Sequence, residues 1–224
     1  LWRYSKPTVP SQRNRCPRLR PQKIKKRLSL NTKPHHRGTQ QAKESEHYML
    51  KSELREAMRN KKRQFSQQQL EELSLPIMGR LLAHERMQTA HTVLMYYSLP
   101  DEVNTHKAIL ELIKRGKQVL LPTVIDGEKM VVRKFEGIQD LREGRFHIME
   151  PTGLPFTDYQ AIDLIAVPGM AFSSSGDRLG RGKGYYDRFL TQVPQAYKIG
   201  VCFDFQKVET IPTEPTDIPM DEVL

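Results

Sequence analysis

Cysteine is scarce in this chain of 224 residues, which contains only Cys16 and Cys202. Two cysteines are too few for the disulfide framework of a small secreted domain, and this scarcity is typical of a reducing compartment. The sequence also lacks any apolar run near the ~20 residues that a transmembrane helix requires. No apolar segment opens the printed sequence, so we expect no secretory signal peptide and predict a cytoplasmic protein without membrane partners.

Acidic residues are nearly absent from the start of the chain. Residues 1–48 contain 13 Lys or Arg and 2 acidic residues, whereas residues 49–224 contain 23 and 24. The net charge of +10 therefore belongs to the start of the chain, and the rest has the balance of an ordinary globular domain. We predict a disordered basic extension over residues 1–44, because its few apolar residues cannot offset the entropy of ordering. Residues 45–224 are predicted to form one α/β domain.

The basic extension has three possible roles. Its cations would attract nucleic-acid phosphates without sequence preference. A basic segment poor in acids is also typical of an organelle transit peptide, although such a peptide normally forms an amphipathic helix. We favour the third interpretation, an upstream extension without function, and expect no nucleic-acid partner.

Apolar periodicity and turn signals predict the helices and strands of the domain. Helices are expected over residues 46–62, 66–81, 104–115 and 185–190, and strands over residues 92–97, 118–124, 129–135, 162–167 and 198–203. The apolar stripes of the first two helices are Leu50, Leu54, Ala57 and Met58, then Leu70, Leu73, Ile77 and Leu81. Ser66 followed by Gln69 is typical of a capping box that starts the second helix, and Pro76 should kink this helix or begin it afresh. Residues 136–160 are expected to be mostly loop, with Phe146 and Ile148 as anchors, and the segment from Pro212 to be extended.

The order of these elements predicts the fold class. The β-α-β succession with short loops favours parallel strands joined by right-handed crossovers. Asp126-Gly127 is typical of a hairpin that adds one antiparallel strand. The prediction is a three-layer α/β fold, with a mostly parallel sheet and helices on both faces.

The residues most suggestive of chemistry lie at 177–190, which read Asp-Arg-Leu-Gly-Arg-Gly-Lys-Gly-Tyr-Tyr-Asp-Arg-Phe-Leu. Three glycines alternate with Arg181 and Lys183, and two tyrosines and Asp187 follow. An apolar strand ends upstream at Pro168, and a helical stripe follows, so backbone N–H groups and cations would face an anion such as phosphate. The spacing matches neither the Walker loop nor Gly-x-Gly-x-x-Gly. A flexible basic turn is the alternative.

Ligands of open α/β sheets bind beyond the carboxyl ends of the strands. Three loops at such ends carry polar residues, namely Glu102, the pair Arg181 and Lys183, and the pair Asp204 and Gln206. Asp187 could be a magnesium ligand in a nucleotide site. Equally, Asp187 could only complement the helix dipole as an acid in the first turn. Asp217, among prolines, is by itself a turn residue. No Cys/His spacing predicts a zinc site.

The segment Arg178-Leu-Gly-Arg-Gly-Lys-Gly-Tyr-Tyr-Asp187 resembles the signature of the 5-formyltetrahydrofolate cyclo-ligases, also called 5,10-methenyltetrahydrofolate synthetases. The resemblance extends over Met49 to Leu224 and includes the pieces 51–55, 100–105, 167–172 and 217–221. It implies conversion of 5-formyltetrahydrofolate to 5,10-methenyltetrahydrofolate with ATP and Mg²⁺, releasing ADP and phosphate. It also implies a monomer with small-molecule substrates, and a fold like that of the sugar-phosphate isomerases and CoA-transferases.

The resemblance further implies a role for each matching position. Nucleotide-binding residues would be Lys51, Arg55, Arg178, Leu179, Gly180, Arg181, Gly182, Lys183, Gly184, Tyr185 and Tyr186. Substrate-binding residues would be Tyr97, Glu102, Phe146, Arg181, Gly182, Lys183, Gly184 and Tyr185. Arg181 and Lys183 would be catalytic, and Asp187 and Asp217 would bind magnesium. Phe146 stands where some relatives carry Trp.

In such a reaction the formamide oxygen is a poor leaving group until it receives the γ-phosphoryl group of ATP. N10 of the resulting iminium phosphate can then close the ring, so the protein mainly positions and neutralises charge. Two other functions remain as alternatives. A sugar-phosphate isomerase would need an acid–base pair and no ATP, and a nucleic-acid-binding protein would use the basic extension with the domain as scaffold.

Overall fold

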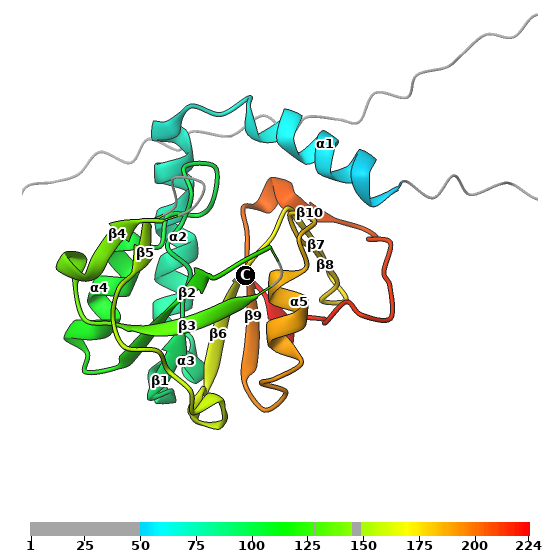
Figure 1. Ribbon diagram of the computed structural model, residues 1–224. Coiled ribbons are helices and arrows are strands. Elements are labelled where there is room, and N and C mark those ends of the chain that lie inside the picture. The colour runs from blue at the N-terminus through cyan, green and yellow to red at the C-terminus, as the bar shows by residue number, and fades with distance from the viewer. Residues whose placement is uncertain (1–49, 128, 145–148) are drawn as a thin grey trace, which may run out of the picture. The chain divides into compact units, whose positions relative to one another are not determined.

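The computed structural model describes residues 50–127, 129–144 and 149–224. The chain divides into two units between Ser45 and Glu46, and all the described helices and strands belong to the second unit (Figure 1). The predicted basic extension lies outside the described residues, as do the predicted anchors Phe146 and Ile148. None of the helices within the described ranges is long and apolar enough to cross a membrane.

A six-stranded sheet in the order β11-β9-β6-β1-β2-β3 forms the centre of the domain. Its strands are β1 (Thr92–Leu94), β2 (Gln118–Val124), β3 (Met130–Phe135), β6 (Leu164–Pro168), β9 (Tyr197–Val201) and β11 (Glu222–Val223). Every neighbouring pair is parallel except β2 and β3. The predicted hairpin joins these two strands, and Lys129 N donates a hydrogen bond to Asp126 Oδ1 at its turn (2.7 Å). The mostly parallel sheet is therefore confirmed.

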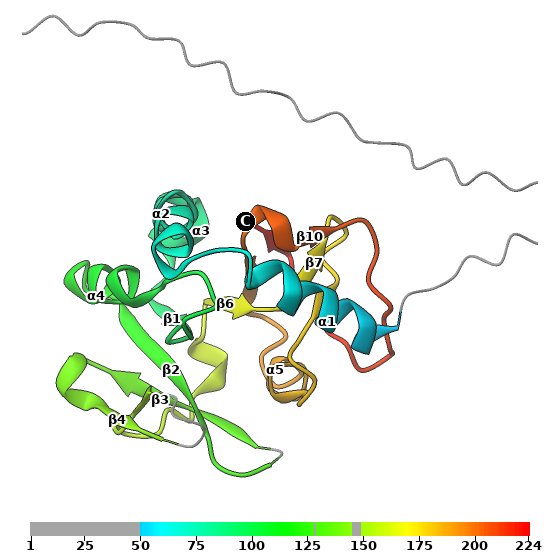
Figure 2. The same cartoon turned by 90° about the horizontal axis from the view of Figure 1, so that it is seen from above.

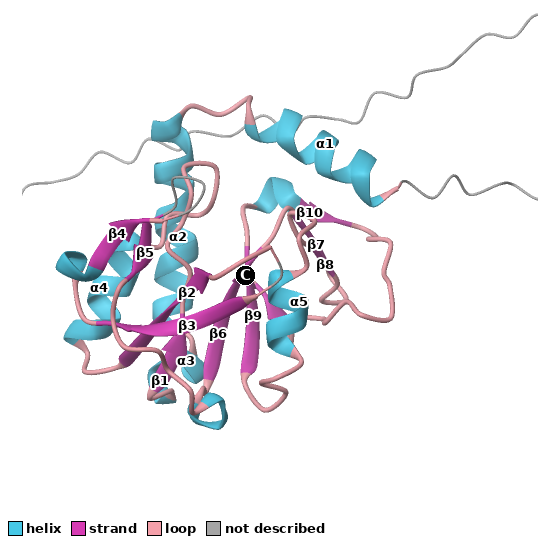
Figure 3. Ribbon diagram, viewed as in Figure 1, coloured by secondary structure: helices cyan, strands magenta, loops and turns pink. Residues whose placement is uncertain are grey.

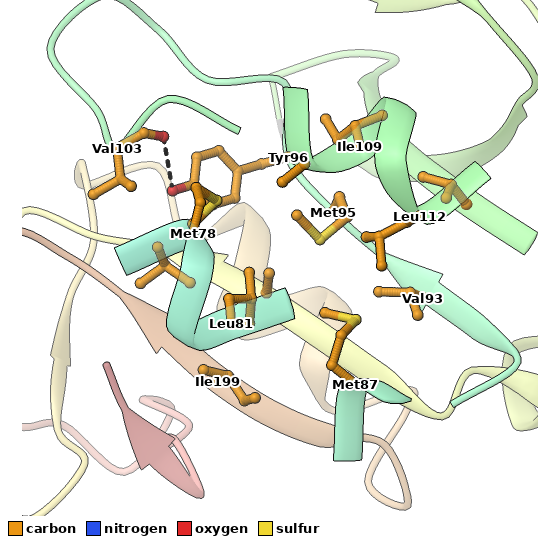
Figure 4. Close-up of a cluster of buried hydrophobic side chains, with 14 of the residues drawn as sticks. Met78, Leu81, Met87, Val93, Met95, Tyr96, Val103, Ile109, Leu112 and Ile199 are labelled. Atoms are coloured by element: carbon orange, nitrogen blue, oxygen red, sulfur yellow. Dashed lines mark hydrogen bonds between the residues drawn. The ribbon is translucent and has the colours of Figure 1, made fainter. Parts of the chain in front are cut away.

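Helices cover both faces of this sheet, as predicted. Figure 2 shows α2 (Gln67–Ala83), α3 (Glu85–Thr89) and α4 (His106–Lys114) on one side and α5 (Tyr185–Leu190) on the other. The alternation of strand side chains explains the three layers. Val93 and Met95 pack into the cluster under α2–α4, whereas Leu94 packs into the cluster with Phe189 of α5. Figure 4 shows the first cluster, in which the Tyr96 hydroxyl donates to the carbonyl oxygen of Val103 (3.3 Å).

Two smaller sheets, which the sequence did not predict, complete the domain (Figure 3). One has the order β10-β7-β8 and consists of β7 (Ala171–Ser173), β8 (Arg178–Leu179) and β10 (Lys207–Val208). The other pairs β4 (Leu141–Glu143) with β5 (Met149–Pro151) inside the segment expected to be mostly loop. The described residues also include short 3₁₀ helices at Ile138–Asp140, Tyr159–Ala161 and Asp204–Gln206. Strands of two or three residues carry too little periodicity to be recognised in a sequence.

The first helix, α1 (Lys51–Lys62), lies beside β7 and β10 (Figures 1 and 2). It is anchored by Leu54 and Met58, which pack with Met170, Leu179 and Ile211 in a separate small core. The predicted face was partly wrong, because Leu50 is 63% exposed and Ala57 is also exposed. The third buried residue of α1 is instead Lys62.

The second helix begins where it was predicted to begin, but its interior differs from the prediction. Ser66 caps α2 by accepting a hydrogen bond from Gln69 N (3.2 Å). Pro76 lies inside one continuous helix, so the helix does not begin afresh there. Leu73 is 40% exposed, and Ser74 is buried instead. The Ser74 hydroxyl donates to the Leu70 carbonyl oxygen (2.6 Å) and accepts from Asn104 N (2.9 Å), which satisfies it inside the core.

Candidate active site

Two cavities meet at the glycine-rich loop, beyond the carboxyl ends of β1 and β6. The first is an open cleft of about 1120 Å³ between α1, the loop, α5 and the segment 212–218, and several charged side chains line it. The second is a pocket of about 340 Å³ with mainly apolar walls, among them Tyr96, Leu99, Pro122, Val124 and Met130. Such a mainly apolar pocket with a few polar groups is typical of a small-molecule site.

The backbone of the glycine-rich loop requires glycine at two positions. Gly182 has φ = 101° and Gly184 has φ = 66°, a region that residues with a side chain rarely adopt. The Arg55 Nε donates to the Gly180 carbonyl oxygen (2.8 Å), so α1 is tied to the loop. These contacts give the loop a defined conformation, and its binding of an anion stays a prediction.

Arg178 and Asp187 form an ion pair at the base of this loop. Arg178 Nη2 donates to Asp187 Oδ1 (2.7 Å), and the two side chains are 4% and 20% exposed. Arg178 Nη1 donates to the Pro168 carbonyl oxygen (3.2 Å), which joins the end of β6 to α5. Asp187 thus has a third role that the sequence did not suggest: it compensates a buried guanidinium.

The far wall of the cleft is held by Lys51. Its Nζ lies 2.6 Å from Asp217 Oδ2 and 3.1 Å from Glu214 Oε1. Burial lowers the pKa of the Lys51 ammonium, but the hydrogen bonds to these carboxylates outweigh burial and raise it. Asp217 also accepts a hydrogen bond from Glu214 N (2.7 Å), which fixes it in a turn among prolines. Its ion pair with Lys51 connects this turn to α1.

Arg181 reaches the second pocket. Its Nε and Nη2 donate to Glu102 Oε1 (3.1 and 2.9 Å), and Nη2 also donates to Asp101 Oδ1 (2.6 Å). Burial by itself lowers the pKa of Arg181. The negative charges of Glu102 and Asp101 outweigh burial, so the pKa of Arg181 is raised overall. The second oxygen of Glu102 accepts from Leu99 N (3.0 Å). Both oxygens of this carboxylate are therefore engaged.

Besides Tyr96, the second pocket is lined by Tyr97, Tyr185 and Tyr186. Tyr97 stacks on His106 with ring centroids 3.8 Å apart, and burial lowers the pKa of His106. The Tyr185 hydroxyl donates to the Asp126 carbonyl oxygen (3.0 Å), which links α5 to the β2–β3 hairpin. The Tyr186 hydroxyl is buried and has no partner among the described residues. Burial and then the negative charge of Glu102 raise the pKa of Tyr186, so this phenol stays protonated.

The structure sorts the predicted site residues between the two cavities. Those that line only the first are Lys51, Arg55, Leu179, Gly182 and Asp217, and those that line only the second are Tyr97, Glu102, Arg181, Lys183, Tyr185 and Tyr186. Four residues line both, namely Arg178, Gly180, Gly184 and Asp187. Phe146 lies outside the described residues.

Some cavity residues were not predicted from the sequence. Arg188 and Glu214 line the first cavity, and Glu150 lines the second. Asp204 and Gln206, expected at a third loop, line neither. The Gln206 amide instead donates to the carbonyl oxygens of Gly169 and Met170 (2.9 Å each), which fixes the loop after β6.

The carboxylates of the first cavity fit a magnesium ion only in the company of a nucleotide. Within the described ranges, no group of three or more His, Cys, Asp and Glu could hold a metal by itself. Hydrogen bonds with described residues use Oδ1 of Asp187 and Oδ2 of Asp217, which leaves one oxygen of each. Mg²⁺ commonly binds through one or two carboxylates, phosphates and waters, so this donor set is suitable.

The fold and the joined cavities define an α/β protein with two adjoining cavities at the carboxyl ends of its strands. A family model for 5-formyltetrahydrofolate cyclo-ligases matches residues 47–224. The chain therefore belongs to the 5-formyltetrahydrofolate cyclo-ligase family and is an enzyme of the ligase class, as the sequence motif predicted. This membership argues against the sugar-phosphate isomerase alternative.

Individual relatives agree with the family assignment. The chain is 31% identical over 175 residues to a 5-formyltetrahydrofolate cyclo-ligase of Escherichia coli, covering 75% of this chain and 95% of the relative. A solved 5,10-methenyltetrahydrofolate synthetase of Aquifex aeolicus has a TM-score of 0.70 at 36% identity, covering 78% of this chain and 89% of that one. A synthetase of Mycoplasma pneumoniae has a TM-score of 0.65 at 26% identity, covering 78% and 98%.

Proposed function

We propose that this enzyme converts 5-formyltetrahydrofolate to 5,10-methenyltetrahydrofolate with ATP and Mg²⁺, as a cytoplasmic monomer. The formyl oxygen attacks the γ-phosphorus, and the bond to ADP breaks with its electron pair on ADP. N10 then attacks the formyl carbon and loses its proton, and the C–O bond breaks to release phosphate. The product is the methenyl cation.

One observation carries this proposal: the two cavities share a wall. Arg178, Gly180, Gly184 and Asp187 line both, so a phosphoryl group at the end of the first cavity would adjoin a ligand in the second. Such contiguity is what transfer between two bound substrates requires. Charged groups fixed at that wall can stabilise the transferred group without reorganisation.

The first cavity, with its charged lining, suits ATP, and the mainly apolar second pocket suits the folate. Lys51, Arg55 and Arg178 place cations around the cleft, where they would neutralise phosphate charge. Tyr97, Tyr185 and Met130 supply aromatic and apolar surface in the pocket, where the folate's rings could pack. Arg181 and Lys183 line the pocket, and their positive charges would stabilise the negative charge of the phosphoryl group as it is transferred to the folate.

Asp187 and Asp217 would hold magnesium together with the nucleotide phosphates. Bound there, Mg²⁺ would neutralise phosphate charge during transfer. Asp217 is paired with Lys51, so we expect Lys51 to exchange part of that contact for phosphate. Asp187 would also hold Arg178 in place at the shared wall through their ion pair.

The test is to incubate the full chain with 5-formyltetrahydrofolate and Mg·ATP and to follow the absorbance of the methenyl product and the release of ADP. Product and ADP should appear in equal amounts, and omission of ATP or chelation of Mg²⁺ should stop both. Absence of methenyl product under these conditions would refute the proposed function. Product formation without ATP would refute the phosphoryl-transfer route.

A further inference from the structure

Lys62 is the last residue of α1 and is buried, although it belongs to a last turn rich in basic residues. Its side chain is only 4% exposed, and its Nζ lies 3.2 Å from Asp101 Oδ2. Lysine is almost never buried to this degree unless its charge is paired. Nothing in the sequence distinguishes Lys62 from Lys61, which is exposed.

Asp101 connects Lys62 to the glycine-rich loop. Its other oxygen, Oδ1, accepts from Arg181 Nη2 (2.6 Å), and Arg181 in turn holds Glu102 Oε1. Lys62, Asp101, Arg181 and Glu102 therefore form a four-residue ion network in which cations and anions alternate. It joins α1, the loop after β1 and the glycine-rich loop, segments that lie 39 and 80 residues apart in sequence.

The network determines which part of Arg181 faces a ligand. The contacts of Arg181 with described residues use Nε and Nη2 and leave Nη1, and the side chain lines the second pocket. Two carboxylates alone would leave the neighbourhood of Arg181 with a net charge of −1. Lys62 restores neutrality, so the charge of Arg181 is not overcompensated and an anionic ligand meets no net negative charge there.

We propose that Lys62 is a positioning residue for the substrate of the second pocket: through Asp101 it fixes the orientation of Arg181 and balances the two carboxylates that hold it. This rests on the proposed function, because the ligand of the second pocket is taken to be the folate. Lys62 itself lines neither cavity. It acts only through Asp101 and Arg181.

The experiment compares Lys62→Met with Lys61→Met in the full chain, at saturating Mg·ATP. Methionine keeps the length of the buried stem and removes the charge. We expect the KM for 5-formyltetrahydrofolate to rise about tenfold in Lys62→Met, since hydrogen bonds to charged groups are worth roughly that factor. The KM for ATP should stay within twofold. Lys61→Met should match the wild type in both.

This division between the two KM values separates positioning from folding. Loss of folded enzyme lowers the apparent kcat and leaves both KM values alone. Asp101→Asn cuts the same link at a residue whose side chain is 40% exposed, so it provides the test if Lys62→Met does not fold. A folate KM within twofold of wild type in a folded Lys62→Met or Asp101→Asn variant would overturn the proposal. If the wild type itself makes no methenyl product, the proposed function fails instead.

The pH profile supplies a second readout. Burial lowers the pKa of Lys62, and the charge of Arg181 lowers it further, while Asp101 and Glu102 oppose this. The ammonium should therefore lose its proton at a lower pH than an exposed lysine, and the folate KM of the wild type should rise there. In Lys62→Met this rise should be absent. An alkaline rise with the same midpoint in both proteins would contradict the assignment.

Discussion

Removal of the Asp187 carboxylate is the sharpest test of the site's architecture. Asp187→Ala leaves Arg178 without its ion-pair partner, and the Arg178 side chain is only 4% exposed. Breaking a buried ion pair by deleting one partner costs ~3–5 kcal/mol, because the remaining charge is uncompensated. Asp187 is 20% exposed, so water offsets part of that cost and we expect the free energy of unfolding to fall by ~3 kcal/mol. A carboxylate that only complemented the helix dipole would contribute ~0.3–1 kcal/mol.

The assay is urea denaturation without Mg²⁺ or nucleotide, so metal binding does not enter the measured free energy. Glu85→Ala is the matched control, because Glu85 is an exposed acid in the first turn of α3. It should cost no more than ~1 kcal/mol. The double variant Arg178→Met, Asp187→Ala should be more stable than the sum of the two single effects predicts, by ~2 kcal/mol. A loss for Asp187→Ala as small as that for Glu85→Ala, without such coupling, would refute the buried ion pair as the role of Asp187.

Four further outcomes are expected. Lys183→Ala should lower turnover by about 10²-fold with the fold intact, because one donor facing phosphoryl charge is typically worth ~2.7–4 kcal/mol; activity within a few-fold of wild type would speak against its role. Asp217→Asn should raise the Mg²⁺ concentration needed for half-maximal turnover at fixed ATP, and an unchanged curve would remove Asp217 from the metal site. Tyr186→Phe removes a buried hydroxyl without a partner among the described residues, so urea denaturation should show equal or higher stability by up to ~1 kcal/mol; a clear loss would reveal a missed hydrogen bond. A chain shortened to begin at Met49 should keep its turnover and its thermal unfolding temperature, and a large drop in either would show that the basic extension contributes.

Local patterns predicted the elements that depend on residues within a few positions of one another. The Ser66 cap, the Asp126-Gly127 hairpin and the glycine-rich loop are all present, and only the structure showed the positive φ angles of that loop. Each is determined by backbone conformation and by hydrogen bonds to nearby residues. The β-α-β order of the elements likewise predicted a mostly parallel sheet covered by helices on both faces. The likeness to the sugar-phosphate isomerase fold stays a prediction.

The prediction of which helix residues are buried was wrong where tertiary contacts changed the free energy of burying a side chain. Leu73 has the helical spacing of a core residue, yet it is 40% exposed. Ser74 is buried in its place because Asn104, thirty residues away, donates to its hydroxyl. A polar side chain is stable in a core only when it has a hydrogen-bond partner there. The apolar periodicity of a helix contains no information about a partner that lies far away in the sequence.

The amino-acid sequence by itself determined the family, the fold class and the glycine-rich loop, since these depend on local residue order and periodicity. Only the tertiary structure decided how the charges of the site are paired. Lys51 meets Asp217 across 166 residues, and Arg181 meets Glu102 across 79. Each charge has several opposite charges as possible partners along the chain. The meeting of loops at the carboxyl edge of the sheet selects among them, because the favourable energy of an ion pair falls steeply with distance and rises with burial.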